Sequence, residues 1–174
     1  MHCSGTTTCP RGATLTEALI AVGVLAVAVP LVFGSLAEAG RSAAAAEAET
    51  RSTWIVDTCM DEIRASREGK PRFFTATKTG EPFPADGEAW ALGFSGDGAL
   101  IGKVEGGEYE NGVKEMDGKT VRYVASMRGA RQSASAGSGA TSNADLLLVR
   151  ISLEYPAVAP AAKRTKLDFH TLVP

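Results

Sequence analysis

Residues 11–37, RGATLTEALIAVGVLAVAVPLVFGSLA, decide the architecture of this chain. Within them, residues 18–37 contain no charged side chain. An α-helix over this run would be about 30 Å long, which is the thickness of the hydrocarbon core of a bilayer. A buried helix of a water-soluble domain is rarely so long and so uniformly apolar. The run is therefore predicted to lie in a membrane.

The predicted helix continues beyond the apolar run and covers residues 13–67. Its second half is rich in alanine, glutamate and arginine, which favour helix formation. Three apolar side chains in that half, Ile55, Cys59 and Ile63, recur at every fourth position and so share one face. This pattern predicts an amphipathic helix that packs the face of Ile55, Cys59 and Ile63 against another layer of the protein.

After the helix, the spacing of apolar residues changes to that of strands. Apolar and polar residues alternate in LLVRISLEY (147–155) and RTKLDFHTLV (164–173). In TVRYVASMR (120–128), the apolar face of the same period consists of Val121, Tyr123, Ala125 and Met127. Two further strands are predicted near 90–95 and 99–104. Such alternation is typical of antiparallel strands with one face buried and the other in water. It places the following polar side chains in water: Arg150, Ser152, Glu154, Arg164, Lys166, Asp168 and His170.

The chain is thus predicted to have an α+β fold, in which a long N-terminal helix packs on a small antiparallel sheet, because each layer alone would leave its apolar face in water. Three parts are expected: a leader at residues 1–12, the membrane half of the helix at 13–40, and an α+β domain at 41–174. Within that domain, the small polar residues of GARQSASAGSGATSNA (129–144) predict a flexible loop. Three glycine-containing segments predict turns: Gly96-Asp97-Gly98, Asn111-Gly112 and Asp117-Gly118.

Composition argues against several functions. Lys and Arg number 18 against 20 Asp and Glu, a net charge of −2, so no nucleic-acid partner is expected. The three cysteines, Cys3, Cys9 and Cys59, are too scattered to predict disulfides, and without a C-x-x-C motif no metal site is expected. The chain has no nucleophile motif, phosphate loop or paired carboxylates, so neither an enzyme nor a bound cofactor is predicted.

One acidic residue, Glu17, stands at the head of the apolar run. A charged carboxylate at the bilayer centre costs about 2.5–3.5 kcal/mol on insertion scales, and less near the interface. Acidic residues within membrane segments usually have a partner. Glu17 is therefore a candidate functional residue.

The junction around Gly12 and Glu17 resembles the prepilin leader and N-terminal helix of type IV pilins, pseudopilins and related filament subunits. In that family a short basic leader ends in glycine, a membrane aspartyl peptidase cuts after it, and the fifth mature residue is glutamate. Here the glycine corresponds to Gly12, the new, methylated N-terminus to Ala13, and the glutamate to Glu17. Leu15 and Pro30 also fit the family's pattern.

The resemblance implies a structural subunit of a type IV pilus or a type II secretion-like filament. Such a subunit is held in the inner membrane by a single span, with its C-terminal domain outside the cytoplasm. The implied partners are the prepilin peptidase, other pilin or pseudopilin subunits, and membrane lipid. In the filament, Glu17 would pair with the free amine of a neighbouring subunit's first residue.

Two positions depart from the family's pattern. Ala13 stands where phenylalanine is most frequent, and Thr16 where an aliphatic residue is usual. The chain also lacks the C-terminal cysteine pair of many major pilins. The resemblance is therefore to a minor pilin or minor pseudopilin, and it leaves open whether the machine serves adhesion, motility, DNA uptake or protein secretion.

Two other interpretations share the apolar run. Ala37-Glu38-Ala39 has the form of a signal-peptidase site, and cleavage there would release a secreted binding domain that starts at Gly40. Alternatively, residues 1–39 are an uncleaved anchor for such a domain. An ordinary signal has a shorter apolar region and is not expected to begin with an acid such as Glu17.

Overall fold

The computed structural model describes residues 14–76, 90–131 and 147–173, and contacts within the chain divide it after Ala45 into two units. The described elements are α1 (Leu15–Arg67), β1 (Trp90–Phe94), β2 (Leu100–Lys103), α2 (Gly106–Asn111), β3 (Glu115–Met116), β4 (Lys119–Thr120), β5 (Tyr123–Arg131), β6 (Leu147–Tyr155), the short 3₁₀ helix η1 (Ala161–Lys163) and β7 (Thr165–Val173).

The described part of the N-terminal unit consists of the first half of α1. The helix begins at Leu15 and continues without interruption through the proline at position 30. The predicted start at Ala13 lies outside the described residues. A single long N-terminal helix is thus confirmed, and its second half belongs to the other unit.

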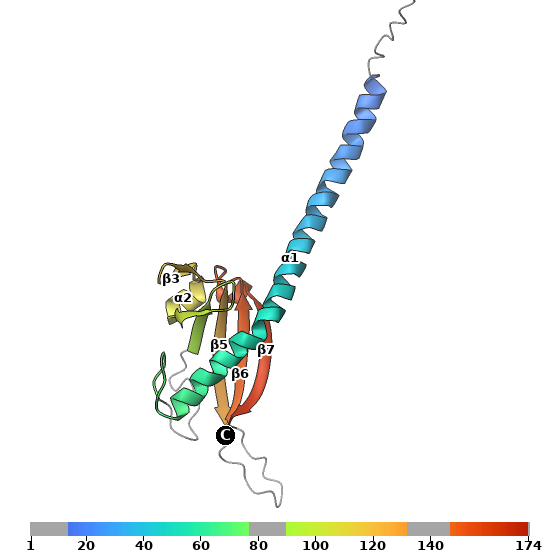
Figure 1. Ribbon diagram of the computed structural model, residues 1–174. Helices are drawn as coiled ribbons and strands as arrows, with labels where there is room; N and C mark the ends of the chain where they lie inside the picture. The colour runs from blue at the N-terminus through green and yellow to red at the C-terminus, as the bar shows by residue number, and fades with distance from the viewer. Residues whose placement is uncertain (1–13, 77–89, 132–146, 174) are drawn as a thin grey trace, which may run out of the picture. The chain divides into compact units, whose positions relative to one another are not determined.

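The second unit contains a five-stranded sheet in the order β2-β1-β5-β6-β7, and each neighbouring pair is antiparallel. The C-terminal half of α1 lies against this sheet (Figure 1). The predicted α+β fold, a long helix packed on an antiparallel sheet, is confirmed. The weaker strand predictions near 90–95 and 99–104 correspond to β1 and β2.

The main core fills the space between α1 and the sheet. Ile55, Cys59 and Ile63 are at most 1% exposed and lie in one apolar cluster with sheet residues such as Tyr123 and Ile151. The face with fourfold spacing is therefore the face that packs. Fully burying an aliphatic side chain of this size contributes about 1.5–3 kcal/mol.

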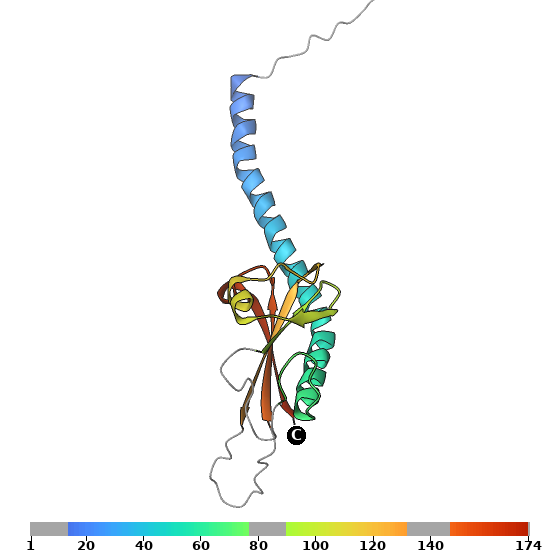
Figure 2. The same ribbon diagram turned by 90° about the vertical axis from the view of Figure 1, so that its left-hand side faces the viewer.

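A second, smaller core lies on the opposite face of the sheet, and the alternation of residues did not predict it. Its buried members are Ala91, Val104, Val113, Val121, Val124 and Ala157. Val121 was expected on the same face as Tyr123, but it precedes β5 and packs with Val124 instead. Tyr109 of α2 and Met116 of β3 pack against this cluster, so α2 and α1 cover opposite faces of the sheet (Figure 2).

Two of the three predicted turns link strands, and the third ends a helix. Gly96-Asp97-Gly98 lies between β1 and β2, and Asp117-Gly118 joins β3 to β4 with both residues at positive φ. Asn111-Gly112 instead ends α2, where Gly112 has a φ of 103°. A Cβ at this position would lie 2.3 Å from the carbonyl oxygen of Val158, so only glycine fits.

The sheet also corrects two expectations about polar residues and loops. Ser152, Glu154 and Arg164, expected in water, are buried, with 8%, 0% and 6% of the whole residue exposed. Strand β5 extends to Arg131, three residues into the stretch 129–144 predicted as a loop, and 132–144 lie outside the described residues. His170, by contrast, is exposed as expected.

Candidate functional site

The first candidate site is the apolar surface of the N-terminal unit. The large apolar side chains of this part of α1 are exposed. Their exposed fractions range from 45% for Val29 to 78% for Leu15. Among the described residues, α1 is the one helix long and apolar enough to cross a membrane, and none of its apolar window is buried within the protein. This surface therefore needs lipid or other apolar helices around it.

Thr14 and Glu17 cap the N-terminus of this helix. The backbone N–H of Thr14 donates to Glu17 Oε2 over 2.8 Å, and the backbone N–H of Glu17 donates to Thr14 Oγ1 over 3.4 Å. The Thr14 hydroxyl also donates to Glu17 Oε2, over 3.2 Å. This reciprocal arrangement is a capping box, which satisfies backbone donors that the first turn of a helix leaves free. Glu17 thus has a local role that the sequence interpretation overlooked, although Thr14-Leu15-Thr16-Glu17 matches the S/T-x-x-E signature.

Two glycines, Gly23 and Gly34, lie within the apolar part of α1. A Cβ added at Gly23 or Gly34 would meet no atom within 4 Å, so nothing in the described chain requires glycine there. Glycines of this kind let helices approach closely in membranes. The predicted processing residues, Gly12 and Ala13, lie outside the described residues.

The helix runs without a break through Ala37-Glu38-Ala39 and Gly40. Arg41 Nη1 lies 3.1 Å from Glu38 Oε2, an ion pair one turn apart on the exposed helix surface. A cut after Ala39 would therefore fall inside regular helix.

The packing residues of the second unit offer no chemistry of their own. Cys59 is buried and free, and its burial, together with the nearby carboxylate of Glu62, raises the pKa of its thiol far above the ordinary value. A thiol in such a place behaves as a small apolar group. Ile55, Cys59 and Ile63 thus position the sheet on α1.

A polar network surrounds the buried carboxylate of Glu154 on β6. Tyr109 of α2 donates to its Oε1 over 2.8 Å, and Ser126 of β5 does so over 3.2 Å. Lys166 of β7 lies 2.9 Å from the same oxygen, and Arg164 lies 3.1 Å from Oε2. Burial raises the pKa of Tyr109, and the negative charge of Glu154 adds to that effect.

Arg164 extends the network to two backbone carbonyls. Its Nε donates to Ala159 O over 2.8 Å, and its Nη2 donates to Tyr109 O over 2.7 Å. The guanidinium also lies over the ring of Tyr109, 5.2 Å from its centroid. The contacts of Arg164 and Glu154 therefore hold α2 and the β6–β7 connection against the sheet.

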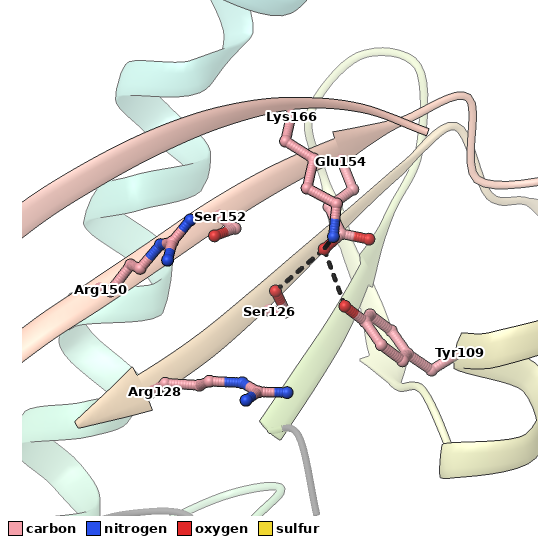
Figure 3. A pocket seen from close by; sticks show the side chains of 7 residues that line it. All are labelled: Tyr109, Ser126, Arg128, Arg150, Ser152, Glu154 and Lys166. Atoms are coloured by element: carbon pink, nitrogen blue, oxygen red, sulfur yellow. Dashed lines mark hydrogen bonds and ion pairs between the residues drawn. The ribbon is translucent and has the colours of Figure 1, made fainter. Parts of the chain in front are cut away.

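Beside this network lies a polar cavity of about 150 Å³. Seven side chains from α2 and three neighbouring strands line it (Figure 3): Tyr109, Ser126, Arg128, Arg150, Ser152, Glu154 and Lys166. If apolar and polar residues alternated strictly along each strand, most of these residues would lie on a face of the sheet fully exposed to water. Because α2 covers one end of that face, the residues instead line a partly enclosed site, and the short sequence of α2 contained no signal for that cover.

Among the described residues, no group of three or more His, Cys, Asp and Glu side chains could hold a metal ion. Comparison with protein-family models, with curated proteins and with solved structures finds no match to this chain.

Proposed function

We propose that this chain is a minor pilin-like or pseudopilin-like structural subunit of a type IV pilus or type II secretion-like filament. In this proposal a prepilin peptidase removes residues 1–12, and Ala13 becomes the methylated N-terminus. The apolar half of α1 holds the subunit in the inner membrane and later packs among the helices of neighbouring subunits. The α+β unit lies outside the cytoplasm.

The observation that supports this proposal most is the construction of α1. One helix has a bilayer-length apolar part with no buried residue in its apolar window, and its other half packs on the sheet through Ile55, Cys59 and Ile63. A subunit of this design satisfies its apolar surface in lipid before assembly and against other helices afterwards. Transfer between the two states then costs little, and an assembly motor can drive it.

Glu17 is the residue through which assembly is proposed to be specific. Its carboxylate is the only charge between Thr14 and Ala37. In an apolar helix bundle, a pair between this carboxylate and a neighbour's N-terminal amine would set the axial register of the subunits.

The second candidate function is a single-pass anchored, or secreted, binding domain outside the cytoplasm. The capping box favours the anchored form of this alternative, because Thr14 satisfies Glu17 within one chain and no second subunit is needed to explain the acid. The unbroken helix through Ala39 argues against cleavage after that residue.

Three variants separate the charge of Glu17 from its capping role. Glu17→Gln keeps a side-chain oxygen that can accept from the Thr14 N–H but removes the charge, since glutamine also serves in a capping box. Thr14→Ala removes the hydroxyl and keeps the charge, and Glu17→Ala removes charge and cap together. Membrane fraction, intact mass and recovery of cross-linked subunits in sheared filaments are measured for each variant beside wild type.

The filament proposal expects Glu17→Gln to insert and to be cleaved like wild type but to lose assembly. Thr14→Ala should still assemble. If Glu17→Gln assembles and Glu17→Ala does not, the cap matters and the charge pair is refuted. If wild type forms no assembled species and keeps its leader, the anchored-domain alternative replaces the proposal.

The same intact-mass measurement tests processing. A native chain that starts at Ala13 supports a prepilin leader. A chain that starts at Gly40 would establish the secretory signal.

A further inference from the structure

The cavity beside Glu154 lies next to a row of basic residues that the proposed function does not use. Arg128 of β5 is directly opposite Arg150 of β6, and Arg150 is directly opposite His170 of β7. All three side chains are exposed. Like charges opposite one another on antiparallel strands destabilise the pair, so the two arginines oppose folding unless anions compensate them.

One of these arginines has its anion within the chain. Arg150 Nη2 lies 2.7 Å from Asp168 Oδ2, and its Nε lies 3.3 Å from Oδ1 of the same carboxylate. The hydroxyl of Ser152 donates to Asp168 as well. This two-point contact is the geometry in which a guanidinium binds a carboxylate most strongly.

Arg128 has no such partner in the described part of the chain. Among the residues that the structure describes, its guanidinium makes no hydrogen bond and no ion pair, and Figure 3 shows it beside the cavity without a dashed contact. The nearby hydroxyls of Ser126 and Tyr109 donate to Glu154 and carry no charge, so they do not neutralise the guanidinium. Within the described part of the chain, Arg128 is therefore the cation of this site that has no anion beside it.

The charges of the site leave an excess of positive charge. Among the described residues, four cations surround two carboxylates: Arg128, Arg150, Arg164 and Lys166 against Glu154 and Asp168. An anion that enters the cavity would meet Arg128 and the remaining N–H donors of Arg150 and Lys166. The cavity therefore attracts negative charge.

The size and wall of the cavity restrict which anion fits. At about 150 Å³ it is smaller than the roughly 300–1,000 Å³ of pockets that hold whole small molecules. The fully buried, negatively charged Glu154 forms part of the wall, and it repels a dianion more than a monoanion. A single carboxylate, planar and singly charged, meets both restrictions and matches the fork of an arginine.

We propose that this cavity binds one carboxylate group through Arg128, with Arg150 and Lys166 as additional donors. The group comes either from a small free carboxylate or from an aspartate or glutamate side chain of another protein. The site lies entirely within the second unit and does not depend on filament assembly.

The test uses the full chain in neutral detergent with ¹⁵N-labelled arginine. The Nε–Hε resonance of Arg128 is followed by NMR during titration with acetate and with the capped tripeptide acetyl-Gly-Glu-Gly-amide. Phosphate and chloride are titrated at matched ionic strength. We expect a saturable shift with a carboxylate, and weaker or unsaturated shifts with the other two anions.

Variants link the binding to the site. Because Arg128→Gln removes the resonance, binding is followed there by the rise in melting temperature that the carboxylate causes. The variant should weaken the apparent affinity at least about tenfold, since one hydrogen bond to a charged group contributes more than one tenfold step. Arg122→Gln, an equal charge change just before β5 at a residue paired with Glu47, should leave the affinity unchanged. Arg128→Lys keeps the charge and loses the fork, so it should bind more weakly than wild type.

Each outcome is decisive. Binding of both acetate and peptide assigns the site to free carboxylates as well as side chains, and binding of the peptide alone assigns it to an acidic side chain. Phosphate binding as tight as acetate would overturn the assignment to a carboxylate. Absence of any saturable shift, or an undiminished affinity in Arg128→Gln, would overturn the site.

Discussion

Arg164 Nη1 lies 3.1 Å from Glu154 Oε2, and neither side chain has any exposed surface. Removing one partner of a buried ion pair typically costs 3–5 kcal/mol, and without Arg164 the buried Glu154 carboxylate would keep only Lys166 as a cationic partner among the described residues. Arg164→Met should therefore lower the free energy of unfolding by about 3 kcal/mol or more. Thermal and denaturant unfolding of the chain in neutral detergent measures this loss.

The neighbouring cation provides the control for that variant. Lys166 contacts the same carboxylate from a side chain that is 43% exposed, so Lys166→Met should cost only about 1 kcal/mol. The double variant Arg164→Met/Glu154→Gln should be more stable than the sum of its single changes predicts, because both charges leave together. Simple additivity would mean that Arg164 acts through its carbonyl contacts alone.

The Asp168 carboxylate links stability to acid pH. Its hydrogen bonds, with Arg150 first and then with Ser152, hold the pKa of Asp168 below its ordinary value. A carboxyl with a lower pKa in the folded state stabilises the fold above its unfolded pKa of about 4, and this stabilisation is lost as the pH falls through the folded pKa. Asp168→Asn should therefore be less stable than wild type near neutral pH, and the two curves should converge in strong acid. Arg150→Gln should reproduce this effect, and parallel curves would refute it.

The glycine at the end of α2 should be irreplaceable. Gly112→Ala forces a side chain into a positive-φ conformation and against the backbone of Val158, so a loss of about 2–4 kcal/mol is expected. Gly107→Ala, in the same helix with open space around it, should be neutral or stabilise by up to about 1 kcal/mol. Melting temperatures of the two variants give the comparison, and equal values would mean that α2 does not depend on the Gly112 turn.

A charge in the seam between helix and sheet should unfold the second unit. Ile63 is 1% exposed, so Ile63→Asp buries an unpaired carboxylate and should cost at least about 4 kcal/mol. Thr53→Asp places the same charge on the exposed face of α1 and should change stability by no more than about 0.5 kcal/mol. Circular dichroism and tryptophan fluorescence report the loss. A folded Ile63→Asp variant would show that the Ile55, Cys59 and Ile63 face is not the packing face.

The sequence alone predicted those features that depend on periodic patterns. The fourfold spacing of Ile55, Cys59 and Ile63 located the buried helix face, and the alternation in residues 147–155 and 164–173 located β6 and the edge strand β7. These patterns succeed because the burial of apolar area decides which face of a helix or strand points into the core. An apolar residue recurs on that face at every turn of a helix and at every second residue of a strand.

The polar network and the cavity could not be predicted in the same way. Alternation assigned Glu154 and Arg164 to water because it assumes that the second face of the sheet is open. In the structure, the short α2, joined to β6 through Tyr109 and Glu154, covers part of that face. Whether such a cover exists depends on contacts between residues 45 positions apart, which no local period encodes. The Thr14–Glu17 cap, by contrast, had a local signature.

Strand β7 ends the sheet on one side, so its outer backbone N–H and C=O groups have no strand beside them within the described chain. β7 is nine residues long, and an unpaired edge of this length can pair with a strand from another molecule and so start aggregation. Its exposed side chains Lys166, Asp168 and His170 line that edge, and an incoming strand would have to desolvate them. The polar residues of β7 therefore make this edge a poor template for a foreign strand, and they protect the second unit against aggregation through its sheet.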